Sequence, residues 1–131
     1  MRKSEIVEKL RAFPFDPSEY WVITGGAMVL YGLREETHDI DLGCTAAMAD
    51  ALEKQGYDCR RTSDGKRALQ LGEDIEVFET WLYDKVVFVD EVPVISIPGL
   101  LEMKRRLGRE KDVRDVALIE EYMKNKDTEV L

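Results

Sequence analysis

The sequence has little of what cysteine or histidine chemistry needs. Its 131 residues include two cysteines and one histidine. Cys44 and Cys59 lie far apart and lack Cys-x-x-Cys spacing, so with a single histidine they cannot build a zinc site of the usual kind. We therefore expect both cysteines to be buried, reduced thiols.

Long apolar runs are also missing. The longest, such as Val86–Val89, have the length of a strand, whereas crossing a bilayer takes roughly 18 apolar residues. The N-terminus is charged and continues into an amphipathic segment instead of the apolar core of a signal peptide. These absences argue against a membrane span and against secretion, so we expect a cytoplasmic protein.

Positive charge is in deficit as well. The chain has 19 Lys and Arg against 27 Asp and Glu, a net charge of −8, and such a surface opposes nonspecific binding to nucleic acid or anionic membranes. A small molecule, a cationic partner or another protein fits better. Since 44% of the residues are apolar, we expect one domain over residues 1–131, with its core at about 20–120 and a polar tail at 125–131.

The hydrophobic pattern predicts both helices and strands. Helices are expected at about 4–13, 27–31, 46–55, 98–107 and 112–124. Strands are expected at 21–24, 38–42, 57–61, 67–71, 74–80, 85–89 and 92–95. Ser4 and Thr45 can cap helices, Gly56 and Gly108 can end them, and Asp64-Gly65 suits a hairpin turn.

Two aspartates follow each other at alternate positions in His38-Asp39-Ile40-Asp41-Leu42. In a strand, Asp39 and Asp41 share one face, and their four oxygens could hold one or two hard cations such as Mg²⁺. An EF-hand is excluded because Ile40 and Leu42 belong to a core. The alternative interpretation is the solvent face of an amphipathic strand. A strand would turn His38 away from Asp39, so we expect His38 to flank the site and not to act as a base.

A third carboxylate is offered by the segment Glu73–Glu79. Period two places Asp74 and Glu76 on one face, and Glu76 could complete a triad if this strand neighbours the Asp39 strand. A solvated edge strand explains the pattern equally well. The choice between Asp74 and Glu76 also stays open.

The pair Gly25-Gly26 stands between a predicted strand and a predicted helix. Backbone N–H groups there could approach a phosphate closely, although the pair matches neither the dinucleotide fingerprint nor the phosphate loop, and a plain turn is the alternative. Arg34 and Thr37 lie between the glycines and the aspartates. Five basic residues lie between Lys104 and Lys111, and most of them are expected to be solvated.

Taken together, several short motifs resemble the signature of the polymerase-beta-like nucleotidyltransferase superfamily. The similarity is greatest to its small bacterial members, related to antibiotic nucleotidyltransferases and AbiEii-type toxins, and covers about residues 20–120. The motifs are Gly25-Gly26-Ala27, Leu30-Tyr31-Gly32, Arg34, Thr37, Asp39-Ile40-Asp41-Leu42, Leu100–Lys104, Gly108–Asp112 and Asp115-Val116.

The resemblance implies an α/β (α+β) fold, a small mixed sheet flanked by helices. It also implies Mg²⁺, with two ions possible, held by Asp39, Asp41 and Glu76, and a nucleoside triphosphate held by the residues around the glycines. A nucleoside monophosphate would pass to an acceptor hydroxyl on a small molecule, a tRNA or a protein. Those nucleotide-binding residues are Gly25, Gly26, Arg34, Thr37 and Lys104.

The sequence departs from the family pattern at three places. Gly26 stands where many members have serine, Glu76 stands where aspartate is usual, and the additional helical domain that binds the acceptor is missing. The enzyme interpretation therefore has alternatives, namely a catalytically inactive binding protein such as a toxin–antitoxin component, or a nucleotide sensor. A homodimer or a partner protein is compatible with each of them.

Overall fold

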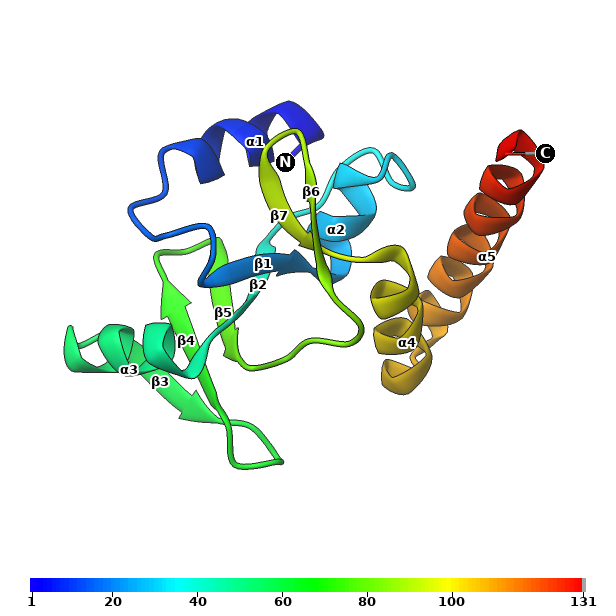
Figure 1. Ribbon diagram of the computed structural model, residues 1–131. Helices are drawn as coiled ribbons and strands as arrows, with labels where there is room; N and C mark the ends of the chain where they lie inside the picture. Colours follow the sequence, from blue (N-terminus) through cyan, green and yellow to red (C-terminus); the bar gives the residue numbers. More distant parts are fainter. Residues whose placement is uncertain (131) are drawn as a thin grey trace.

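The computed structural model of the protein describes residues 1–130, with side chains over residues 1–126. Within this part, helices and strands alternate along the first half of the chain, and two helices close the second half (Figure 1). The helices are α1 (Lys3–Arg11), α2 (Thr24–Leu30), α3 (Ala46–Lys54), α4 (Ile97–Leu107) and α5 (Glu110–Val130). The strands are β1 (Tyr20–Ile23), β2 (Ile40–Cys44), β3 (Asp58–Arg61), β4 (Arg67–Leu71), β5 (Ile75–Glu79), β6 (Val86–Val89) and β7 (Val92–Ile95).

All seven strands join one mixed sheet in the order β3-β4-β5-β2-β1-β7-β6. The β3–β4 and β6–β7 pairs are hairpins, and β1–β2 and β4–β5 are also antiparallel. The β2–β5 and β1–β7 pairs are parallel, so each needs a longer connection. The predicted mixed sheet with flanking helices is confirmed, and β2 lies at its centre.

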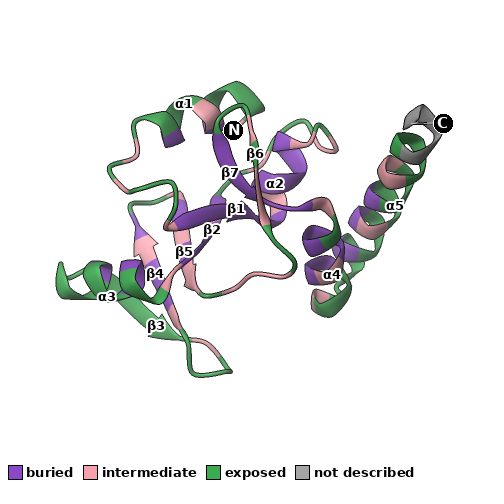
Figure 2. Cartoon of the chain, viewed as in Figure 1, coloured by how far each residue is buried: buried purple, intermediate pink, exposed green. Residues whose placement is uncertain are grey.

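Alternate residues of β2 serve two different faces of the sheet. Ile40, Leu42 and Cys44 are buried on the face that α2 and α3 cover, together with apolar residues of the neighbouring strands. Asp41 and Gly43 point to the opposite face. The central strands are buried along their length while β3 and the outer side of α5 are exposed (Figure 2). The core thus lies against the face of the sheet opposite to the side chain of Asp41.

Gly43 allows the chain to cross this opposite face closely. A Cβ at position 43 would lie 2.0 Å from Trp21 Nε1 and 2.7 Å from the carbonyl oxygen of Trp81. Trp21 Nε1 donates a hydrogen bond to that oxygen at 2.9 Å. The segment between β5 and β6 therefore covers the sheet beside β1 and leaves the start of β2 open.

Several local signals act as predicted. Thr45 Oγ1 accepts a hydrogen bond from the N–H of Met48, Gly56 and Gly108 have φ of +91° and +59°, and Gly65 turns the β3–β4 hairpin. The Ser4 cap is wrong, because α1 begins at Lys3 and the Arg2 N–H donates to Glu5 Oε1 at 3.2 Å. Helix α5 begins at Glu110 and includes residues 125–130 of the expected polar tail, while Leu131 lies outside the described residues.

The two cysteines have different environments. Cys44 is buried in the core as predicted, but Cys59 is exposed. The reason is that β3 is an edge strand whose four residues are all exposed. In the described part of the chain, no helix has the length and apolar character needed to cross a membrane.

Candidate functional site

The glycine pair lies inside a helix and not in a turn before it. Helix α2 begins at Thr24, so Gly25 and Gly26 form its first turn. A Cβ at Gly25 would lie 2.9 Å from Thr37 Oγ1 and 3.0 Å from an Arg34 nitrogen, so glycine lets this loop approach the helix. Gly26 instead packs against Val22 of β1 and is buried. Only the first glycine faces the site.

Two of the acidic candidates, Asp41 and Glu76, lie side by side on neighbouring strands. They pair in register on the parallel strands β2 and β5, so their side chains leave the same face of the sheet. Asp41 Oδ2 accepts a hydrogen bond of 2.8 Å from Thr24 Oγ1. Burial is the main cause that raises the pKa of Asp41, and the nearby Glu76 and Asp39 raise it further against the opposing effects of Thr24 and Lys104.

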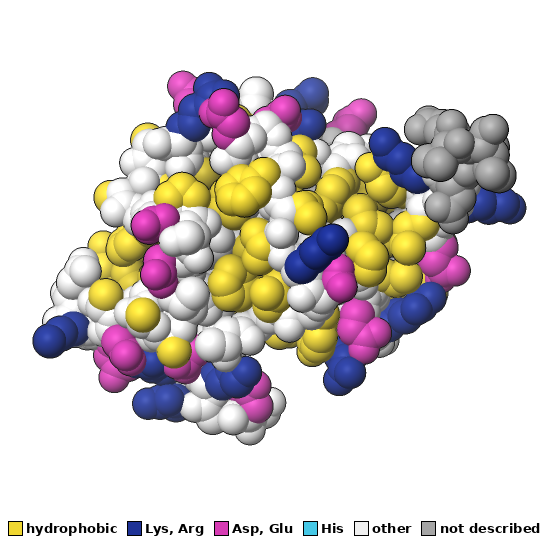
Figure 3. Space-filling view, viewed as in Figure 1, with side chains coloured by type: hydrophobic (Ala, Val, Ile, Leu, Met, Phe, Trp, Pro, Cys, Tyr) yellow, Lys and Arg dark blue, Asp and Glu magenta, His cyan; other side chains and the backbone are white. Residues whose placement is uncertain are grey.

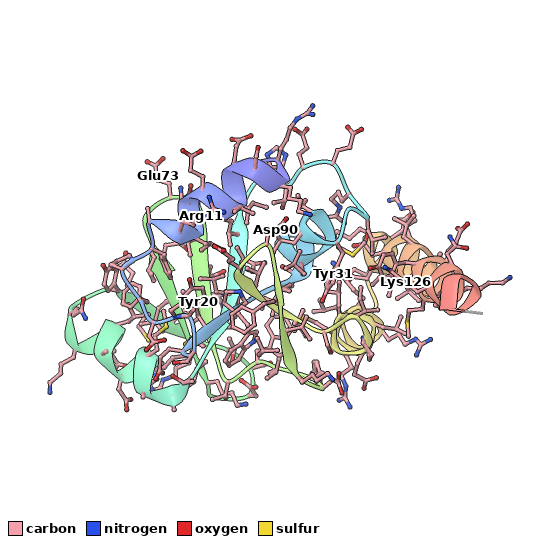
Figure 4. All side chains as sticks on the ribbon, turned by 45° about the horizontal axis from the view of Figure 1, so that its top comes forward. Arg11, Tyr20, Tyr31, Glu73, Asp90 and Lys126 are labelled. Atoms are coloured by element: carbon pink, nitrogen blue, oxygen red, sulfur yellow. The ribbon has the colours of Figure 1, made fainter. Side chains whose placement is uncertain are left out.

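The remaining acidic candidates lie outside the two strands. Asp39 precedes β2 and is exposed, and its carbonyl oxygen accepts a bond of 3.1 Å from Thr37 Oγ1. Asp74 precedes β5 and pairs with Lys9 of α1. Glu73 is exposed and points away from the sheet (Figure 4). Glu76 is thus the acidic residue of this segment that lies beside Asp41.

His38 does not behave as the strand pattern predicts. It precedes β2 by two positions, so strand alternation does not turn it away from Asp39. Both residues are exposed and line the same cavity. The strand begins only at Ile40, where pairing with β5 starts.

A cavity of about 320 Å³ lies between the start of β2, the start of α2 and the α4–α5 junction. Four basic and three acidic side chains line it. The lining residues are Thr24, Gly25, Arg34, Glu36, Thr37, His38, Asp39, Asp41, Lys104, Arg109 and Lys111. The structure therefore brings together six predicted site residues and leaves Gly26 and Glu76 outside the cavity wall.

Lys104 lines this cavity and belongs to a buried ion-pair network. Its side chain is 3% exposed, and Nζ lies 3.3 Å from Asp112 Oδ1 and 2.9 Å from Asp115 Oδ2. Arg34 contacts both oxygens of Asp115 at 2.8 and 2.7 Å, and Arg109 contacts Asp112 at 2.6 Å. Two buried aspartates thus hold three cations.

The sequence pattern does not predict the ion-pair partners of Lys104. Asp112 and Asp115 stand three positions apart on α5, which predicts a shared helix face, but nothing local shows that this face meets Lys104. Although burial acts in the other direction, bonds from Arg109 and then from Lys104 hold the pKa of Asp112 below its usual range. Arg109 and Lys111, predicted to be only solvated, are exposed but line the cavity.

The carboxylate oxygens of Asp39, Asp41 and Glu76 are suitable ligands for a hard cation, but they do not converge on one point. Carboxylate oxygens are the ligands that Mg²⁺ prefers, and a cation would stabilise the charged form of Asp41, which burial disfavours. Among the described residues, no group of three histidine, cysteine, aspartate or glutamate side chains is arranged to hold a metal ion. The chemistry of Asp39, Asp41 and Glu76 fits Mg²⁺, although only the two aspartates line the cavity.

Two solved structures share this architecture. One is TM1012 of Thermotoga maritima, a candidate nucleotidyltransferase, with a TM-score of 0.58 and 17% identity over 93% of this chain and 90% of the other. The second is ANT(2″)-Ia in complex with adenylyl-2″-tobramycin, with a TM-score of 0.52 and 15% identity over 98% of this chain and 90% of the other. No family model matches the sequence, and no curated protein matches it. The comparisons confirm a nucleotidyltransferase-like fold.

Proposed function

We propose that the protein transfers a nucleoside monophosphate from a nucleoside triphosphate to a hydroxyl group of a small-molecule acceptor, with Mg²⁺ held by Asp39, Asp41 and Glu76. The observation that carries this proposal is the position of the Asp41–Glu76 pair beside a cavity with four basic side chains. Carboxylates on one side and cations on the other suit a metal–triphosphate complex.

Each part of the cavity has a role in this proposal. Arg34, Lys104, Arg109 and Lys111 provide positive charge for the phosphates, and the absent Cβ of Gly25 lets Arg34 and Thr37 lie close to the first turn of α2. Thr24 orients Asp41 through its hydroxyl group. Bound Mg²⁺ would neutralise the negative charge that develops on the transferred phosphate and on the leaving pyrophosphate.

Two observations support a small acceptor. The net charge of −8 opposes a nucleic-acid acceptor such as tRNA. One structural neighbour, ANT(2″)-Ia, is in complex with adenylyl-2″-tobramycin, which is a small molecule carrying an adenylyl group. Glu76 lies on the neighbouring strand β5, outside the wall of the cavity, where Arg60 contacts it.

The second candidate is a binding protein without catalysis, for example one component of a toxin–antitoxin pair. It is favoured by the lack, among the described residues, of a gathered three-residue metal group. Such a protein should co-purify with a partner and should not consume a nucleoside triphosphate.

The test is a thermal-shift titration with ATP, GTP, CTP and UTP, each with Mg²⁺. A ligand at about 100 times its Kd stabilises the native state by about 2.7 kcal/mol, which raises Tm by about 10 °C in a domain of this size. Asp41→Asn should abolish the shift and leave the metal-free Tm unchanged or higher, because it removes like-charge repulsion. Release of pyrophosphate then reports transfer.

Asp90→Asn is the matched control. Asp90 lies in the β6–β7 turn and is not among the residues that line the cavity, and its φ of +49° suits asparagine. The charge change equals that of Asp41→Asn, so this variant should keep the full shift. The proposal fails if no triphosphate shifts Tm and Asp41→Asn behaves as the wild type does.

A further inference from the structure

The proposed third carboxylate is held by an arginine. Arg60 of β3 contacts Glu76 Oε2 through Nε at 3.2 Å and through a terminal nitrogen at 3.0 Å. The Arg60 side chain is 59% exposed and that of Glu76 is 25% exposed. Both line a small hollow of about 170 Å³ on the open face of the sheet. Glu76 therefore faces a guanidinium group and not the other two acidic residues.

Strand alternation explains why Arg60 reaches Glu76. Arg60 pairs in register with Ala68, which pairs with Phe78, so its side chain shares the face of Glu76 and Phe78. The guanidinium lies 5.9 Å from the centroid of the Phe78 ring, which adds a cation–π contact. Arg61, the next residue, points to the other face and donates to the Gly65 carbonyl oxygen.

We infer that Arg60 is a positioning residue that competes with the metal ion for Glu76. This inference rests on the proposed function, because it assumes that Glu76 is a metal ligand. Arg60 balances the charge of Glu76 beside the half-buried Asp41, and a metal ion has to take its place.

Because β3 is an edge strand, replacing Arg60 by a metal ion at Glu76 costs little free energy. All four residues of β3 are exposed, and β4 is its only neighbour in the described sheet. A surface arginine can therefore turn into solvent without disturbing packed side chains. Arg60 sets the affinity of the site for its metal ion, and its removal strengthens metal binding.

The experiment measures Mn²⁺ affinity by isothermal titration calorimetry for wild type, Arg60→Met and Arg61→Met. Both variants remove one positive charge from the same strand, but only Arg60→Met removes a contact with Glu76, whereas Arg61→Met removes a bond to the Gly65 carbonyl oxygen. Arg60→Met should bind Mn²⁺ about two- to five-fold more tightly than Arg61→Met, as expected for loss of a partly exposed ion pair. Without metal, Arg60→Met should melt at a lower temperature than Arg61→Met.

Two further variants complete the test. Arg60→Lys keeps the charge but loses the two-nitrogen contact, so its affinity should lie between those of wild type and Arg60→Met. Glu76→Gln should weaken Mn²⁺ binding and remove the difference between the two methionine variants. Equal affinities of Arg60→Met and Arg61→Met overturn this inference alone, whereas absence of Mn²⁺ binding in every protein overturns the proposed function with it.

Discussion

Thr24 has a backbone conformation that threonine rarely adopts. Its φ is +50°, in the left-handed region, and a β-branched side chain there costs about 1–2 kcal/mol. The residue is 8% exposed, and its hydroxyl group donates to Asp41. The strain is therefore located where the cavity wall meets the central carboxylate.

We expect Thr24→Val to lower the free energy of unfolding by about 1–2 kcal/mol, because Asp41 loses a donor in a half-buried position. Thr24→Gly should lose less, since glycine adopts positive φ without strain. Urea unfolding of both variants measures the difference. A glycine variant less stable than the valine variant would show that the backbone at Thr24 is not strained.

A second residue-scale prediction concerns pH and the Arg67–Glu79 pair. Arg67 contacts Glu79 Oε2 at 2.6 Å, with side chains 12% and 14% exposed, and this contact holds the pKa of Glu79 below its usual value of 4.5. A lowered pKa gives stability that is complete above pH 4.5 and is lost as pH falls through the folded-state pKa.

Glu79→Gln should therefore destabilise the protein by about 2 kcal/mol at pH 7, and the deficit should shrink as pH falls below 4.5. Urea unfolding at a series of pH values measures it. Glu53→Gln is the control, because Glu53 also contacts Arg67 but is 46% exposed, so its loss should stay below about 1 kcal/mol. A Glu79→Gln deficit independent of pH would contradict the assignment.

At the scale of elements, α5 packs against α4, and both helices contribute buried apolar residues to the core. Ile119, Leu100 and Met103 are all 0% exposed. They lie next to Lys104 and its two aspartates, so helix packing and charge pairing stabilise the same junction. Tyr31 adds a ring contact of 6.2 Å with Tyr122 further along α5.

Ile119→Ala should lower the free energy of unfolding by about 2–5 kcal/mol, because it leaves a cavity in this junction. Leu118→Ala is the matched control. Leu118 is the neighbouring residue and is 44% exposed, so its loss should stay below about 1 kcal/mol. Chemical denaturation measures both, and equal effects would mean that α5 packs on α4 through another face.

Elements with turn residues at both ends were predictable from the sequence. Strands β4 and β7 have the predicted bounds, Arg67–Leu71 and Val92–Ile95, since glycine, aspartate or proline stands near each end. The start of α2 was not predictable, because two glycines indicate a turn and only packing against β1 and the Arg34 loop keeps them helical. The order of the strands in the sheet could not be predicted either, because parallel pairing depends on contacts between residues distant in sequence.

At the scale of the whole molecule, the molecular surface is not uniformly polar. Apolar side chains gather around the middle of the face shown in Figure 3, and Phe88 on the edge strand β6 is 63% exposed. An apolar edge strand is a place where another chain could pair. The expected homodimer or partner protein stays a prediction, and β6 is where such a contact should be sought.

The candidate site was predictable where its residues are close in sequence. The structure brings Gly25, Asp39 and Asp41 to one cavity, as their spacing predicts, while metal and phosphate binding there stays a prediction. The Arg34–Asp115 contact joins residues 81 positions apart, so no local pattern could reveal it. The Arg60–Glu76 ion pair could not be predicted for the same reason, because it depends on the register of three strands.

The central position of β2 also determines when the site forms during folding. The β3–β4 and β6–β7 hairpins join neighbouring segments and can form early, whereas Asp41 meets Glu76 only after the parallel β2–β5 pair closes a long loop. Partly folded chains therefore lack the Asp41–Glu76 pair. A ligand that recognises the finished sheet slows unfolding and leaves the folding rate unchanged.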